Sequence, residues 1–193
     1  MKFDASIVSL GSWNSRIFTP DWVSNNIFAM PEGESMNISL DENQLSLSYE
    51  WKSIHFIMSD DRVVFKTNEN SASTLKLMEE CYKRLIDLLC YTPISAVGFN
   101  LNLILNNDEF LSTKINALIK TQNVGEYVNT SFTFNNFKDK FQRNIVVKIN
   151  KNGGEIRANF HYPRYVSLPT VGTAFTQIAS DLINFLGYEF SFK

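Results

Sequence analysis

The side chains best suited to nucleophilic or metal chemistry are two cysteines and two histidines, Cys81, Cys90, His55 and His161. A cysteine nucleophile needs a histidine base within hydrogen-bond reach. Both cysteines flank the apolar stripe of one predicted helix, whereas both histidines alternate onto the opposite face of predicted strands. The sheet should therefore separate the thiols from the imidazoles, and we predict neither a Cys–His nucleophile nor a zinc site.

The two cysteines are also placed where they cannot form a disulfide. The nine-residue step from Cys81 to Cys90 corresponds to about 13 Å along a helix axis, beyond the reach of a bridge. Free thiols fit a reducing cytosol. The sequence has no run approaching the roughly 20 apolar residues that cross a bilayer, and its first residues lack the apolar core of a signal peptide. We therefore predict a cytoplasmic protein with no membrane partner.

Motifs for phosphate binding and acyl hydrolysis are missing from the sequence. It contains no GxxxxGK[ST], no GxGxxG and no GxSxG segment. The adjacent acidic pairs fit structural roles instead. Asp60-Asp61 suits a hairpin turn, Asp108-Glu109 suits a helix start, and Glu79-Glu80 suits the solvated face of a helix. We therefore predict a protein that is not an enzyme, with no catalytic residues, no cofactor and no metal.

A basic, amide-rich hairpin is the strongest candidate for a binding face. Residues 1–100 hold 8 basic and 13 acidic side chains, whereas residues 101–193 hold 10 basic and 7 acidic ones. Many of the Lys and Arg side chains of residues 101–193 lie in or beside two predicted strands that are joined by an Asn-Gly-Gly turn. Such a face suits phosphates or an acidic partner surface, and an ordinary solvated face is the alternative. The candidate residues are Arg143, Lys148, Arg157, Asn159 and His161.

Two-residue alternation predicts the strands that must position these side chains. Four strands in the first half follow one another with short polar connections, which is typical of an antiparallel meander. A strand over residues 3–10 and a short helix over residues 20–28 precede them. The four meander strands are predicted over residues 36–40, 45–51, 53–58 and 62–66.

A long amphipathic helix follows the meander. Its apolar residues recur at steps of three and four and form one stripe, with Ser71 or Ser73 as the N-cap. The polar face predicts two ion pairs in the favourable i,i+4 order, Glu79–Lys83 and Glu80–Arg84. The stripe consists of Leu75, Met78, Tyr82, Leu85 and Leu89.

The second half of the chain then repeats a similar order of elements. The patterns predict a strand over 97–105, a helix over 108–120, further strands around Phe132 and over 143–150 and 155–162, and a helix over 175–185. The long helices of the two halves have the same apolar spacing at an offset of 100 residues. We infer one compact α+β domain over 1–193 that is built as a tandem duplication of units 1–92 and 93–193.

In this scheme each unit runs strand, helix, meander, helix, and both long helices pack on one face of antiparallel sheet. This order of elements resembles the two-repeat arrangement of TATA-binding-protein-like folds. The resemblance covers most of the chain but carries no sequence motif of that family. It therefore implies a fold and implies nothing about DNA binding.

The leading functional interpretation is a non-enzymatic assembly or adaptor protein that binds another protein or itself as a homo-oligomer. The opposite charges of the two halves favour association between molecules. The outer face of the predicted helix over 175–185 is nearly free of charge, which is typical of an interface. Specific partners are not evident from one sequence.

Two alternatives stay open at this point. A nucleic-acid-binding accessory protein would use the basic hairpin, although Phe160 and Tyr162 fall on its core face, where they cannot stack on bases. The net charge of -2 and the pI of about 5.7 also argue against a generally basic binder. An enzyme or small-ligand binder would need polar groups that point inward between sheet and helices, and the alternation places few there.

Overall fold

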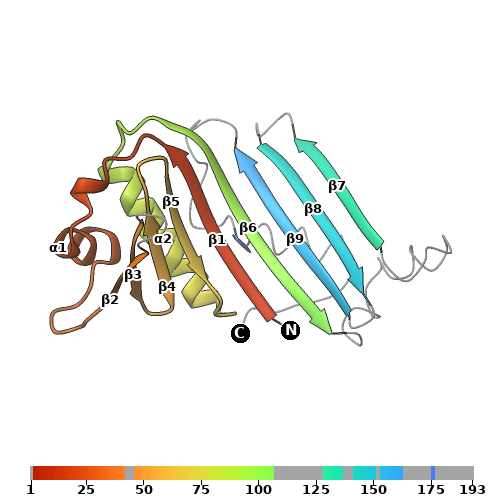
Figure 1. Cartoon of the computed structure of the whole chain (residues 1–193), viewed down its shortest axis with the longest axis horizontal. Coiled ribbons are helices and arrows are strands. Elements are labelled where there is room, and N and C mark those ends of the chain that lie inside the picture. Colours follow the sequence, from red (N-terminus) through yellow and green to blue (C-terminus); the bar gives the residue numbers. More distant parts are fainter. Residues whose placement is uncertain are drawn as a thin grey trace.

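A computed structural model describes residues 2–41, 46–106, 128–136, 141–150, 153–162 and 175–176. The described strands form one antiparallel sheet of 9 strands in the order β2-β3-β4-β5-β1-β6-β9-β8-β7 (Figure 1). The strands are β1 (Lys2–Gly11), β2 (Asn37–Asp41), β3 (Ser46–Trp51), β4 (Ile54–Met58), β5 (Arg62–Thr67), β6 (Ile94–Asn106), β7 (Val128–Asn136), β8 (Phe141–Asn150) and β9 (Gly153–Tyr162).

The antiparallel meander of the first half is confirmed. Strands β2 to β5 pair in sequence, and β5 returns to pair with β1 in the middle of the sheet. On its other edge β1 pairs with β6 along its whole length, from Lys2 opposite Ile104 to Gly11 opposite Ile94. The sheet is therefore continuous across the predicted boundary between residues 92 and 93.

The predicted fold class is wrong in its helices. The sheet dominates the structure, and one long helix, α2 (Ala72–Leu88), is found in the described part of the chain. The other described helical segments are short: η1 (Ser15–Ile17), α1 (Pro20–Trp22) and η2 (Val23–Phe28). Periodic apolar spacing was too weak a basis for two long helices, because any amphipathic stretch of three turns shares it.

The predicted helix over 108–120 lies outside the described residues, and so does that over 175–185 except for Phe175 and Thr176. The resemblance to TATA-binding-protein-like folds rested on the same element order and is withdrawn with it. The tandem duplication of 1–92 and 93–193 stays a sequence prediction. The α+β character with antiparallel sheet is confirmed.

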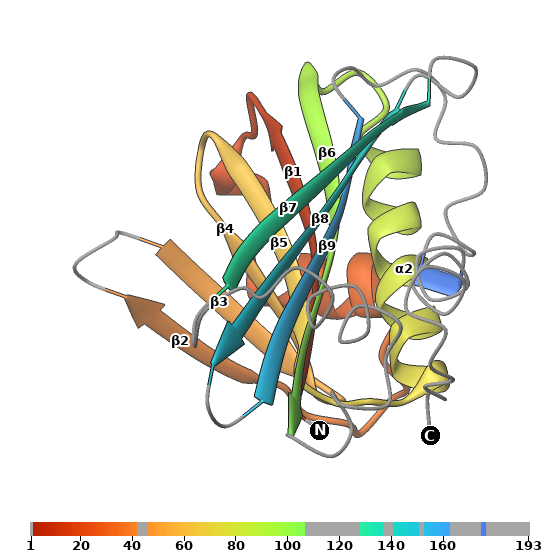
Figure 2. The same ribbon diagram turned by 90° about the vertical axis from the view of Figure 1, so that its right-hand side faces the viewer.

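The core lies between α2 and one face of the sheet, and Figure 2 shows α2 along that side. Alternate strand residues are buried there, as the predicted alternation requires. Aromatic rings run through this core in edge and stacked contacts, with Phe56 on Phe65 at 4.6 Å and Tyr82 against Phe99 at 6.2 Å. Each such pair adds about 0.5–1.5 kcal/mol to the burial of the rings.

Helix α2 begins where its predicted cap is. Ser71 is the N-cap, and its side chain accepts a hydrogen bond from the Thr74 N–H. The predicted Glu80–Arg84 pair is wrong, because the Arg84 guanidinium instead donates to the carbonyl oxygens of Ile27, at 2.7 Å, and Phe28. These bonds satisfy carbonyls at the end of η2 and tie that segment to α2.

Gly11 ends β1 at a register shift, where the chain passes very close to another segment. A Cβ at this position would stand 2.5 Å from the Pro93 carbonyl oxygen, which is backbone and cannot swing aside. We therefore expect Gly11→Ala to lower the free energy of unfolding by about 1–3 kcal/mol, as overpacking does elsewhere. Urea denaturation should measure it, with exposed Ser12→Ala as the near-neutral control. A Gly11→Ala protein as stable as wild type would contradict this close approach.

Candidate functional site on the open face of the sheet

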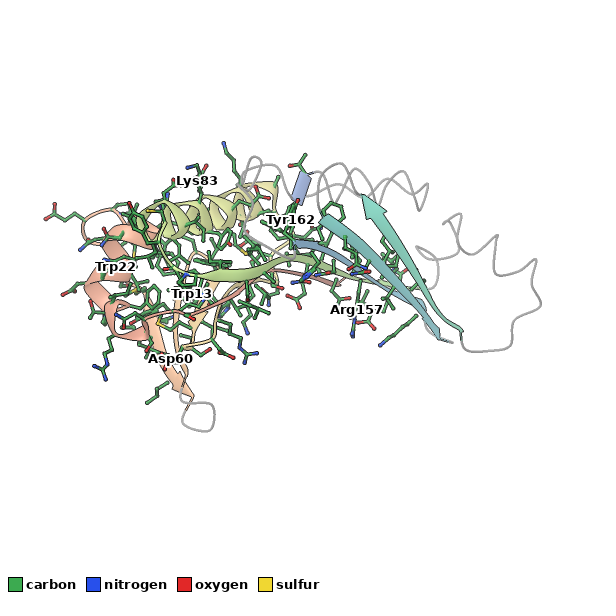
Figure 3. All side chains as sticks on the ribbon, turned by 90° about the horizontal axis from the view of Figure 1, so that it is seen from above. Trp13, Trp22, Asp60, Lys83, Arg157 and Tyr162 are labelled. Atoms are coloured by element: carbon green, nitrogen blue, oxygen red, sulfur yellow. The ribbon has the colours of Figure 1, made fainter. Side chains whose placement is uncertain are left out.

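The face of the sheet opposite α2 is not covered by any described element, and we call it the open face. It is formed by even-numbered residues of β1, β5, β6 and β8 and odd-numbered residues of β4 and β9. In Figure 3 Lys83 on α2 and Arg157 on β9 lie on opposite sides of the sheet. Alternation of side chains produces this division, because it sends each neighbouring residue to the other face.

A row of hydrogen-bonded side chains crosses four neighbouring strands on the open face. Asn100 Nδ2 donates to Ser6 Oγ at 3.3 Å, and Asn159 Nδ2 donates to Asn100 Oδ1 at 2.5 Å. Asn144 Nδ2 donates to Asn159 Oδ1 at 3.4 Å. The strand register aligns these residues, since Ser6 lies opposite Asn100, Asn100 opposite Asn159, and Asn159 opposite Asn144. We call these four residues the amide row.

The hydrogen bonds within the amide row orient its side chains and still leave some of their donors and acceptors unused. A side-chain amide has two N–H donors and two acceptor lone pairs. Within the row, Asn100 and Asn159 each use one donor and one acceptor, so a second of each stays outside the row. All four side chains are half-buried. They therefore present an ordered line of donors and acceptors to whatever lies on this face.

Two shallow hollows adjoin one another on the open face. One, of about 450 Å³, is lined by the amide row together with Arg157 and other residues. The other, of about 390 Å³, has His55, Lys66 and Ile104 in its lining. Asp4 and Asn102 line both. Asn102 Oδ1 is buried without a hydrogen-bond partner among the described residues, so it is an acceptor that a bound group could satisfy.

A short apolar stripe runs beside the amide row. The register places Val8, Val64 and Ile57 side by side across β1, β5 and β4, and all three side chains are half-buried. Ile104, which is 44% exposed, adds an apolar side chain on the far side of the row. The open face thus combines apolar contact area with ordered polar groups, which is the usual composition of a protein interface.

Charges on the open face are mixed in sign rather than basic. Arg157 Nη2 lies 2.7 Å from Glu155 Oε1, and its Nε donates to the same oxygen at 2.9 Å. His55 Nε2 lies 3.7 Å from Glu50 Oε1 on the neighbouring strand. The strongest basic side chain of the predicted hairpin is therefore already paired with a carboxylate, and this pairing lowers its value as a phosphate ligand.

The structure brings together four of the five predicted site residues. Lys148, Arg157, Asn159 and His161 share the open face, and Asn159 is the centre of the amide row. In the strand register residue 143 pairs with Phe160, which is buried in the core. The binding role of the five predicted residues stays a prediction.

The separation of Cys81 from the imidazoles follows the prediction, whereas Cys90 lies beyond the last residue of α2. Cys81 is buried on α2, whereas His55 and His161 belong to the open face, on the other side of the sheet. Asp60 and Asp61 lie in the turn between β4 and β5, where Ser59 Oγ donates to Asp61 Oδ1 at 2.6 Å. This hydrogen bond lowers the pKa of Asp61.

The two free cysteines should differ sharply in reactivity. Cys90 is exposed, whereas burial raises the pKa of the Cys81 thiol to about 11 from 9.0. Roughly a hundredfold less thiolate is then present at Cys81 near neutral pH. We expect Ellman's reagent to label one thiol per native chain and two after unfolding, and Cys90→Ser to abolish the native reaction. Rapid labelling of two thiols in the native protein would contradict the burial of Cys81.

The raised pKa of Cys81 also fixes a direction for the pH dependence of stability. A neutral thiol is favoured in the folded state, so its contribution is complete below about pH 9 and is lost as the pH rises toward 11. Cys81→Ala should flatten the fall in stability over this window, measured by urea denaturation at each pH. If the free energy of unfolding of Cys81→Ala fell with pH as steeply as that of wild type, the Cys81 thiol would not be the group responsible.

A buried carboxylate on α2 was missed by the sequence analysis. Glu79 is only 2% exposed, and its Oε1 accepts a hydrogen bond from the Phe175 backbone N–H at 2.7 Å. The predicted ion pair with Lys83 is wrong, since Lys83 pairs with Asp87. The one signal in the sequence was the position of Glu79, which lies between the stripe residues Met78 and Tyr82 and therefore at the edge of the buried face of the helix.

Comparison with known proteins does not assign a family to this chain: it matches no protein-family model, and no curated protein is significantly similar to it. Within the described ranges, no group of three or more His, Cys, Asp or Glu side chains is placed to hold a metal ion. None of the helices described has the length and apolar character to cross a membrane.

Proposed function

We propose that this protein is a non-enzymatic interaction protein that binds a partner protein through the open face. The observation that carries the proposal is the amide row, an ordered set of polar groups on a sheet face that no described element covers. An ordinary solvated sheet face has no need of side chains cross-linked over four strands. These side chains are already ordered before binding, so less conformational entropy is lost when a partner binds.

The chemistry of the face favours a protein over a nucleic acid. Arg157 is paired with Glu155, and Asp4 stands between the two hollows. A nucleic-acid platform combines unpaired cations with exposed aromatic rings for stacking. The aromatic rings of the neighbouring strands, such as Phe99 and Phe160, are buried on the other face instead. Nucleic-acid binding through the basic hairpin is thus less well supported than binding of a partner protein.

The partner surface that would fit has a definite chemistry. The apolar stripe of Val8, Val64 and Ile57 would receive aliphatic side chains, and the amide row would pair with amides, hydroxyls or peptide groups of the partner. The mixed charges around the row would contribute to orientation and on-rate rather than to affinity. The free thiols of Cys81 and Cys90 support a cytoplasmic location for this complex.

A pair of matched substitutions tests the proposal. Ile104 on the open face and Leu88 at the end of α2 are 44% and 51% exposed, so Ile104→Glu and Leu88→Glu change the same surface chemistry on different faces. Tagged wild-type and variant proteins would be used to capture partners from native cytosol, with and without nuclease. We expect a stoichiometric protein that survives nuclease, is lost at least about tenfold with Ile104→Glu, and is kept with Leu88→Glu.

Other outcomes would overturn the proposal. Equal loss with both variants, or no loss with either, would show that the captured protein does not bind the open face. A partner released by nuclease would favour the nucleic-acid alternative, and charge reversal at Lys148 and Arg157 should then abolish binding in a salt-dependent way. Urea denaturation of both variants checks that neither has unfolded.

A further inference from the structure

Strand β2 is an edge of the sheet, with no described strand on its outer side. It pairs with β3 on one side and is the outermost strand in the sheet order, as Figure 2 shows. Residues 37–40 are all exposed, and its two apolar side chains, Ile38 and Leu40, are 48% and 62% exposed. Edge strands usually carry a lysine, a proline or a bulge that prevents further pairing. Strand β2, with the sequence NISLD, has no lysine, proline or bulge, and its one charged residue, Asp41, is the last of the strand.

The apolar side of β2 continues the core of the protein. Ile38 lies opposite Tyr49, which is fully buried, and Leu40 lies opposite Leu47, which packs against the core from its edge. The core therefore ends at two exposed aliphatic side chains rather than at a polar rim. A further strand on this edge would cover both and would satisfy the outward backbone groups of β2.

We propose that a second copy of this chain occupies this edge, with the two β2 strands paired antiparallel about a two-fold axis at Ser39. This register uses all five residues of the strand. It places Ile38 opposite Leu40 of the second copy on the apolar side, and Asn37 opposite Asp41. No like charges then face each other, and a self-complementary strand is what a two-fold interface requires.

The resulting dimer joins two 9-stranded sheets into one continuous sheet. The contact is short, because five residues of strand span only about 17 Å. We therefore expect a weak, concentration-dependent dimer rather than an obligate one. The β2 edge and the open face are separate surfaces, because Ile38 and Leu40 are on the core side of the sheet and Ile104 is on the other.

Sedimentation velocity over a wide concentration range tests the association. We expect wild type to shift from monomer to dimer, and Leu40→Lys to weaken the dimer at least about tenfold through lost apolar contact and charge repulsion. Ile104→Lys, at a side chain of similar exposure on the open face, should leave it unchanged. A wild-type protein that stays monomeric throughout, or equal effects of both variants, would overturn the proposal.

Cysteine cross-linking tests the register. In a Cys90→Ser background, which removes the exposed thiol, Ser39→Cys should form a disulfide-linked dimer with diamide, because residues facing each other across paired strands have Cα atoms about 4.5–5.5 Å apart. Asn37→Cys should not, since its two copies would stand four residues apart along the strands. Equal cross-linking at both positions, or none at Ser39→Cys, would exclude this pairing. Both proteins keep the buried Cys81 beside the introduced cysteine, and urea denaturation of each would reveal a misfolded variant.

Discussion

Phe56→Ala should lower the free energy of unfolding by about 3–5 kcal/mol, the loss typical of a large ring removed from a packed core. Phe56 is fully buried, stacks on Phe65 at 4.6 Å and meets Phe18 edge-on at 5.5 Å. It therefore joins the meander to the segment that precedes α1, and its removal opens a cavity that neither element can close alone. Urea denaturation followed by far-ultraviolet circular dichroism would measure the change.

The next residue along β4 supplies the control. Ile57 is half-buried on the open face, so Ile57→Ala removes a side chain of the same strand without opening a cavity in the core. We expect a loss below about 1.5 kcal/mol. Equal losses for Phe56→Ala and Ile57→Ala would contradict the assignment of the two faces of the sheet, on which the location of the open face depends.

Glu79→Ala should cost about 2–3 kcal/mol, although the sequence places this residue on a solvated helix face where its removal would cost almost nothing. The Glu79 carboxylate is buried and accepts the Phe175 N–H at 2.7 Å, and a hydrogen bond to a charged group contributes about 1.5–3 kcal/mol. Its loss leaves a buried backbone donor without that acceptor. Glu79→Gln, which keeps an acceptor oxygen, should lose less.

Glu80 is the matched control for this prediction. It is the neighbouring residue on the same helix, its side chain is 46% exposed, and it lies 3.9 Å from Lys76 Nζ. A surface pair of this kind contributes about 0–1 kcal/mol, so Glu80→Ala should leave stability nearly unchanged. Indistinguishable effects of Glu79→Ala and Glu80→Ala would show that Glu79 does not hold the segment at Phe175.

The strands of the first half could be predicted because one buried face imposes strict alternation on the sequence. Phe56 and Phe65 fall on the core side and His55 and Lys66 on the other, as the two-residue period requires. Arg143 was grouped with Lys148 by charge, and the register pairs residue 143 with Phe160 but residue 148 with Glu155.

The amide row could not be predicted, although its three asparagines all occupy outward positions. Asn100, Asn144 and Asn159 come from three strands, and their alignment depends on the order β6-β9-β8 and on its register. One sequence shows which face a residue takes but not which strand lies beside it. Glu79 was missed for a similar reason, because its partner is 96 residues away and the helical pattern gives no sign of it.

Site-specific photo-cross-linking tests the central proposal most directly, because it reports which face a partner touches. A benzoylphenylalanine would replace Arg157 on the open face or, as a control, Lys76 on α2, whose side chains are 54% and 72% exposed. We predict a protein adduct from position 157 in native cytosol, resistant to nuclease and weakened by Ile104→Glu, with none from position 76. No adduct at position 157, or the same adduct from both positions, would contradict a partner-binding role for the open face.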